Sequence, residues 1–286
     1  MADDPPSSLP LDQSHVLLTS FNTFLTVAIH NILYYRSLYP PQTFLSTRAY
    51  NLPVHQNRHP KVCTWISDAV TSVAAQLATG KVSLIAVVLH SPLDDPLLLS
   101  PLSPSPTTTT IPPGSVLERY TFDTSHFPTW PTPSINTYAR ILHKDSRSEV
   151  TRDALFNHPS LNLTNLNEQF RGCLLKMAQA MEGLSPIPEG CTFTLAVELK
   201  DEAAAPIGHP QDWIPSEPTA PPSEPQDKKG KGRYVEPVAS RAETGVTVKT
   251  TPVRVVEAGP LWFECWVEES RAKVELMERG ASQGSV

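Results

Sequence analysis

Residues Val82–His90 have the sequence VSLIAVVLH, from which the central sheet of the molecule can be predicted. The run is β-branched and almost continuously apolar, which predicts a central β-strand that is covered on both faces. The next strand-like run is Val116–Asp123, VLERYTFD, and we expect it to be the antiparallel neighbour of the first. Residues 91–115 between them are rich in proline, serine and threonine, which predicts a long disordered connection.

Three helices are predicted around these strands. The first is expected from Ser14, as its N-cap, to about Leu38, because apolar residues recur there at three- and four-residue steps. Polar residues interrupt this stretch, so we interpret it as an amphipathic helix and not as a membrane span. The second helix is expected over Pro60–Ala78 and the third over Leu161–Glu182, and a glycine follows each of them closely.

The C-terminal half adds three more strand-like runs. Cys191–Lys200 alternates polar and apolar residues, and Val246–Val256 and Leu261–Glu268 follow after about 50 residues without such a pattern. Glu269–Arg279 is predicted to be a charged helix. The order is therefore helix, helix, hairpin, helix, strand, long segment and final strands, which indicates an α+β fold.

Composition limits both the shape and the function. The chain has 286 residues and 30 prolines against 12 glycines, and its formal net charge is -6. The prolines concentrate in a few stretches, so one continuous compact core over the whole length is excluded. The negative charge argues against a protein that mainly holds nucleic acid, and we expect no direct nucleic-acid binding.

The sequence contains no pattern that predicts catalysis. The four cysteines form no C-x-x-C pair, and His55 and His59, although spaced like metal ligands, lie in a predicted loop between prolines. We therefore expect no enzyme activity, metal or cofactor, with an enzyme of an unidentified fold as one alternative. The basic run Lys228–Arg233 fits a nuclear import signal and a solvated linker equally well.

Several blocks resemble the HORMA-domain family in the order expected for it. The blocks are FLTVAIHNILY at 24–34, YP at 39–40, YNLPV at 50–54, HP at 59–60, WISD at 65–68, GCTFTLAV at 190–197, DWI at 212–214 and WVEE at 266–269. The YNLPV and CTFT blocks favour the mitotic-arrest-deficient-like branch that provides the accessory subunit of DNA polymerase zeta. They disfavour the spindle-checkpoint branch.

The resemblance implies three helices packed on a mostly antiparallel sheet, with a C-terminal safety belt over residues 201–268. It places the domain at 13–275, between a disordered N-terminus (1–12) and a disordered tail (276–286). The proline-rich inserts at 91–115 and 125–158 depart from the compact family pattern. In this family the belt closes over a short proline-containing segment of a partner. Backbone pairing contributes affinity, and enclosure slows dissociation.

The resemblance also implies roles for individual residues. Trp65 and Trp213 match positions that contact the captured peptide, although Trp65 stands where tyrosine is usual and has a core role as its alternative. Glu264 and Trp266 match a surface for a second partner, the C-terminal domain of an inserter polymerase. Its third position falls near Thr250, where the family has leucine.

Trp266 has an alternative too, in which it lies in the core together with Phe263. Arg171 matches a HORMA–HORMA dimer interface, and its alternative is an ordinary solvated arginine.

The resemblance implies a non-enzymatic adaptor of translesion DNA synthesis in the nucleus, with the cytoplasm as a second location. It would clamp a peptide of the catalytic subunit of DNA polymerase zeta and bridge to an inserter polymerase. A homodimer or heterodimer of HORMA domains would be compatible with this role, and no membrane is involved. The alternative is a cell-cycle adaptor that captures a peptide of an activator of the anaphase-promoting complex.

Overall fold

The computed structural model describes residues 9–93, 113–128, 130, 161–200, 213 and 247–275. Their elements, in chain order, are α1 (Leu11–Tyr35), η1 (Pro41–Thr43), β1 (Phe44–Ala49), β2 (Leu52–Asn57), α2 (Pro60–Leu77), β3 (Val82–His90), β4 (Val116–Asp123), α6 (Leu163–Glu182), β5 (Thr192–Leu199), β6 (Thr247–Ala258) and β7 (Leu261–Ser270). Residues 271–275 form a last helical turn. The predicted disorder at both termini, the middle of the first insert, almost all of the second insert and most of the belt lie outside the described residues.

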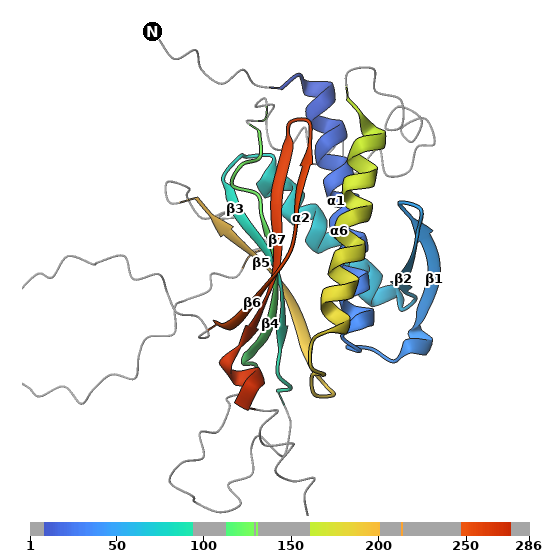
Figure 1. Cartoon of the computed structure of the whole chain (residues 1–286), viewed down its shortest axis with the longest axis vertical. Coiled ribbons are helices and arrows are strands. Elements are labelled where there is room, and N and C mark those ends of the chain that lie inside the picture. Colours follow the sequence, from blue (N-terminus) through green and yellow to red (C-terminus); the bar gives the residue numbers. More distant parts are fainter. Residues whose placement is uncertain are drawn as a thin grey trace, which may run out of the picture.

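A five-stranded sheet in the order β5-β3-β4-β7-β6 forms the centre of the molecule (Figure 1). All of its neighbouring strands are antiparallel. The predicted pairing of Val82–His90 with Val116–Asp123 is confirmed, and β3 and β4 have the predicted bounds. The α+β class agrees with the sequence-based expectation, and so does the order of the elements apart from β1 and β2, which were not predicted as strands.

The helices and the sheet enclose one apolar core. In α1, Phe24 stacks on Phe170 of α6 with ring centroids 4.6 Å apart, and it meets Phe122 of β4 edge-on at 6.0 Å. Figure 1 shows α1 and α6 running beside each other along the sheet. By length and composition α1 could cross a membrane, but 67% of its apolar window is buried inside the molecule. It is the central core helix of this fold.

A second, two-stranded sheet (β1 and β2) packs against α1. The sequence predicted only a short, partly extended segment with a turn here. Tyr50 and Asn51 close the hairpin with positive φ angles of 49° and 59°. The His55 ring stacks on Tyr34 of α1 with centroids 3.4 Å apart, and its backbone N–H donates to the Asn31 side chain.

The first helix differs from its prediction at both ends. Ser14 is not the N-cap, because the helix begins at Leu11 after Pro10, and the Ser14 hydroxyl donates to the Pro10 carbonyl at 2.9 Å. The helix ends at Tyr35, two residues before Ser37 takes a left-handed backbone with a φ of 54°. A left-handed residue cannot continue an α-helix, so the predicted end at Leu38 was too late.

Candidate functional site

Strand β5 leaves one edge of the sheet open. It pairs with β3, and no described strand pairs with its other side. Its exposed side chains are Thr192, Thr194, Ala196 and Glu198, and its half-buried side chains, which pack on the core, are Phe193, Leu195, Val197 and Leu199. An edge strand of this kind presents unpaired backbone N–H and C=O groups, which are a template for one more strand.

Trp65 lies beside this open edge. Its side chain is 43% exposed, while the next residue of α2, Ile66, is fully buried. The Trp65 ring meets Phe193 of β5 edge-on, with centroids 4.8 Å apart. The alternative that placed Trp65 in the core is therefore wrong. An exposed tryptophan that is held by a neighbouring ring is the kind of aromatic anchor that dominates peptide interfaces.

Trp213 belongs to the segment between β5 and β6. It is half-buried and packs against the core. Within the described part of the chain, it makes no aromatic contact with Trp65. The structure thus places Trp65 and Phe193 together at the β5 edge but does not bring the two predicted tryptophans into contact.

The C-terminal hairpin occupies the opposite edge of the sheet. Strands β6 and β7 pair with each other, and β7 pairs with β4. The chain that leaves β5 therefore returns at the far edge, and residues 200–246 connect the two edges. Because the hairpin is seated on β4, it does not cover the open edge of β5.

The proposed second-partner residues lie on the sheet face opposite the core. Along β7 the buried residues Phe263 and Cys265 alternate with the half-buried Glu264 and Trp266. The alternative in which Trp266 and Phe263 share the core is wrong, because they point to opposite faces. The Trp266 indole N–H donates to Glu268 at 2.8 Å.

The neighbours of Glu264 and Trp266 complete this face. Glu264 is paired in register with Asp123 of β4, whose carboxylate accepts the backbone N–H of Ser125 at 2.9 Å. Two acidic residues thus occupy neighbouring positions on this face of the sheet. Thr250, which is exposed, pairs in register with Glu268 at the other side of the same hairpin.

Arg171 lies on the exposed side of α6. It is 43% exposed and forms an ion pair with Glu168 at 2.9 Å, one turn earlier in the helix. The exposed leucine of the same helix, Leu175, is 46% accessible and lies one turn after Arg171. Leu175 was not predicted from the sequence as a surface residue, although its position outside the apolar stripe of the helix indicates that it is exposed.

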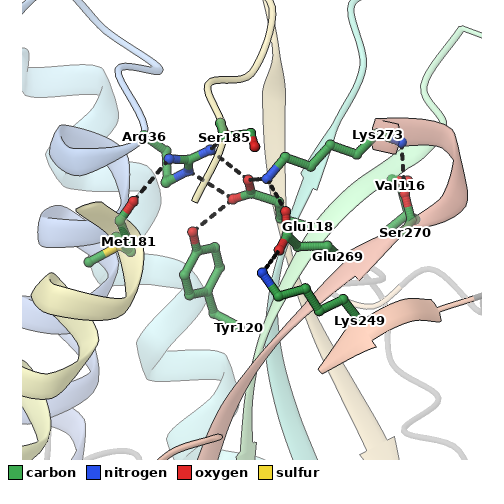
Figure 2. Close-up of polar contacts among 10 residues, drawn as sticks. All are labelled: Arg36, Val116, Glu118, Tyr120, Met181, Ser185, Lys249, Glu269, Ser270 and Lys273. Atoms are coloured by element: carbon green, nitrogen blue, oxygen red, sulfur yellow. Dashed lines mark hydrogen bonds and ion pairs between the residues drawn. The ribbon is translucent and has the colours of Figure 1, made fainter. Parts of the chain in front are cut away.

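A buried charge cluster was missed by sequence reasoning (Figure 2). Arg36, the C-cap of α1, donates two hydrogen bonds to the Glu118 carboxylate of β4, at 2.9 and 2.6 Å. Tyr120 donates its hydroxyl to the same carboxylate at 2.7 Å. Burial and the Glu118 charge raise the pKa of Tyr120 well above its ordinary value, so it stays a donor.

Lys273, in the helical turn after β7, completes the cluster. Lys273 lies 2.6 Å from Glu118 and 2.6 Å from Glu269, and its side chain is 1% exposed. Lys249 of β6 also pairs with Glu269, at 3.2 Å, but its side chain is 62% exposed. Burial alone would raise the pKa of Glu269, but the two ammonium groups outweigh burial and hold it below its usual value.

Within the described part of the chain, no group of three histidine, cysteine or acidic residues is arranged to hold a metal ion. All four cysteines are free. What the described geometry offers is an open strand edge, an aromatic anchor beside it and a hairpin fixed at the far edge.

The chain belongs to the HORMA domain family, whose model matches residues 18–236. Among its relatives, the DNA polymerase zeta processivity subunit of Schizosaccharomyces pombe is 32% identical over 251 residues, which cover 87% of this chain and 91% of the relative. The human mitotic spindle assembly checkpoint protein MAD2B is 25% identical over 180 residues, covering 63% and 64%. A chain of the mitotic checkpoint complex crystal structure shares the fold with a TM-score of 0.54, at 15% identity and 88% and 98% coverage.

Proposed function

We propose that this chain is a non-enzymatic adaptor subunit of translesion DNA polymerase zeta, acting in the nucleus. It captures a proline-containing peptide of the catalytic subunit by adding it as a strand to the open edge of β5. The observation that carries the proposal is this open edge with Trp65 held against Phe193 beside it. Backbone pairing along the edge would supply affinity, and the side-chain positions along β5 would supply sequence choice.

The connection between β5 and β6 supports an enclosing role. The five-stranded sheet is about 19 Å wide from β5 to β6, at ~4.8 Å per strand. Residues 200–246 connect these edges, and a fully extended chain of that length reaches well over 100 Å. The connection is therefore long enough to pass around a peptide that lies on β5. Trp213, within that connection, is the residue we assign to contact the peptide from the other side.

The outer face of β7 is proposed as the second docking surface. Thr250, Glu264 and Trp266 would receive the C-terminal domain of an inserter polymerase, and the Glu264–Asp123 pair favours a partner that brings a cation. Arg171 with Leu175 would serve a contact with a second HORMA domain. These surfaces lie on different elements from the open edge of β5, so one protein could hold several partners at once.

A cell-cycle role is the second candidate. It is favoured by the relatives named mitotic spindle assembly checkpoint protein MAD2B. Such an adaptor would use the same open edge for a peptide of an activator of the anaphase-promoting complex.

A direct competition separates the two candidates. The purified protein is titrated calorimetrically with synthetic peptides from the polymerase zeta catalytic subunit and from the anaphase-promoting-complex activator of the same organism. The proposal predicts that the polymerase peptide binds at least tenfold more tightly, a difference of about 1.4 kcal/mol. Preference for the activator peptide would favour the checkpoint role, and binding of neither would contradict peptide capture altogether.

A further inference from the structure

The buried charge cluster contains two ion pairs from different parts of the fold, which are joined by a third between Lys273 and Glu118, and the exposed Lys249 adds a fourth to Glu269 (Figure 2). Arg36 and Glu118, the α1–β4 pair, join the end of the first helix to the sheet. Glu269 and Lys273, the hairpin pair, lie at the end of β7 and just after it. Each pair contains one cation and one carboxylate, so each is neutral on its own.

This division has a consequence for detachment of the C-terminal hairpin. If β6 and β7 left β4, Glu118 would keep its two hydrogen bonds from Arg36 and the one from Tyr120. Lys273 would keep Glu269, four residues before it. Removing one member of a buried ion pair usually strands an unpaired charge at high cost. Separation between two neutral pairs avoids that cost, so the cluster adds no unpaired buried charge to the cost of exposing the core residues Val256, Phe263 and Val267 when the hairpin leaves β4.

Several side-chain contacts join the C-terminal hairpin to β4, among them an ion pair between Arg119 and Glu268 at 3.5 Å, whose side chains are 28% and 20% exposed. The Lys273 ammonium donates to Glu118 at 2.6 Å, and the Ser270 hydroxyl donates to the Val116 carbonyl of β4. The bond from Lys273 is charge-assisted and almost completely buried, which makes it the strongest of these contacts. It is therefore the side-chain contact whose loss should most ease release of β7 from β4.

Strand β6 has a separate attachment on α6. The Arg254 guanidinium lies against Gly172, where a Cβ atom would come within 3.0 Å of it, and it donates to Gln169 at 2.9 Å. A glycine in mid-helix costs about 1 kcal/mol relative to alanine, and here it makes room for this side chain. Arg254 of β6 and Lys273, which lies just after β7, thus attach the hairpin at two places.

We propose that Lys273 is a positioning residue for peptide capture. Its bond to Glu118 sets how often the C-terminal hairpin leaves β4, and hence how fast an enclosed peptide enters and escapes. The inference rests on the proposed function, because the captured peptide is the one assigned to the β5 edge. The lysine acts through the hairpin and makes no contact with the peptide.

The test compares Lys273→Met with Lys249→Met. Both variants remove an ammonium group that pairs with Glu269, but Lys273 is buried and links to Glu118, while Lys249 is largely exposed. Amide hydrogen exchange is measured in the full chain without peptide, for β7 and for the central strand β3. The dissociation rate of the polymerase zeta peptide is then measured for each variant.

We expect β7 amides to exchange about tenfold faster or more in Lys273→Met, which corresponds to losing a hydrogen bond to a charged group. Exchange in β3 should stay unchanged, and peptide dissociation should accelerate by a similar factor. Lys249→Met should match the unmodified protein, because exposed ion pairs contribute little. Unchanged β7 exchange, or an equal rise in β3 and β7, would overturn the inference.

Two further outcomes remain informative. If no peptide binds the unmodified protein, the proposed function fails, while the exchange comparison still decides the role of Lys273. If Lys273→Met does not fold, Ser270→Ala replaces it; this variant removes the bond to the Val116 carbonyl of β4 and the acceptor of the Lys273 backbone N–H, and it keeps the Lys273 ammonium. It should raise β7 exchange several-fold without changing β3, and a β7 rate equal to that of the unmodified protein would overturn the inference.

Discussion

His30 shows how one buried side chain couples the fold to pH. It lies on α1, where its Nδ1 accepts the backbone N–H of Asn57 and so helps to fix β2. Burial lowers the pKa of His30 from 6.5 to about 4. The neutral form is therefore favoured in the folded state, while the unfolded chain takes up a proton near pH 6.5.

The first prediction follows from this difference. The stability contributed by His30 is complete above pH 6.5 and is lost as the pH falls from 6.5 to about 4. The loss is at most about 3 kcal/mol. His30→Asn keeps an acceptor near Nδ1 and should flatten the decline of the unfolding free energy in urea over this interval. The control is His59→Gln at an exposed position, and it should show the same decline of the unfolding free energy as the unmodified protein. An equally steep decline in His30→Asn would refute the assignment.

Trp65 supports a second prediction about a single residue. Trp65→Ala should weaken peptide capture by about 2 kcal/mol or more, because a buried aromatic anchor at an interface is lost. The variant should stay folded, since the side chain is 43% exposed in the free protein. Calorimetric titration measures the affinity, and Leu45→Ala, which removes another exposed apolar side chain, is the control. Equal affinity in Trp65→Ala and Leu45→Ala would rule out the anchor.

At the scale of elements, local patterns predicted much of the fold. The continuous apolar run of β3 and the alternating run of β5 were assigned within a residue of their observed bounds. The β1–β2 hairpin was missed as a pair of strands, because its exposed β1 has no apolar period and its pairing depends on α1. Trp266 was placed on the correct strand, and its spacing of three from Phe263 already places the two side chains on opposite faces, as the structure shows.

The first insert gives a prediction about elements. Its two ends are held together, since the Ser91 N–H donates to the Ser115 carbonyl at 2.8 Å and His90 bonds to the Gly114 carbonyl at 3.0 Å. Replacing residues 93–112 by a short glycine–serine linker should therefore leave the melting temperature and peptide capture nearly unchanged. Thermal unfolding and titration measure both. A large drop in melting temperature would show that the leucines of the insert pack on the domain.

The outer face of β7 gives a further prediction at the scale of elements. Trp266→Ala should abolish recruitment of the inserter polymerase domain and leave the peptide bound, because Trp266 lies on the face away from the core. A three-component reconstitution of protein, peptide and inserter domain measures both partners in one experiment. Trp65→Ala is the reciprocal control and should lose the peptide alone. Loss of both partners in Trp266→Ala would indicate a folding defect, and retention of both would remove the proposed second surface.

At the scale of the whole molecule, the account depends on which edge of the sheet the C-terminal hairpin takes. Sequence patterns predicted the strands of the hairpin but not the edge, because that choice depends on contacts between distant residues. Arg36 and Glu118 are 82 positions apart, and Glu118 and Lys273 are 155 apart. No local pattern distinguishes such partners from solvated charges, so the buried cluster could not be predicted. With the hairpin on β4, no described strand covers the other edge of β5.

The central claim is that a peptide joins the sheet at β5. The most direct measurement is hydrogen exchange of the backbone amides with and without a saturating amount of the polymerase zeta peptide. The account predicts strong new protection along Thr192–Leu199 and none along β6, the edge strand at the opposite side of the sheet. Tight binding of the peptide with unchanged exchange in β5 would contradict it.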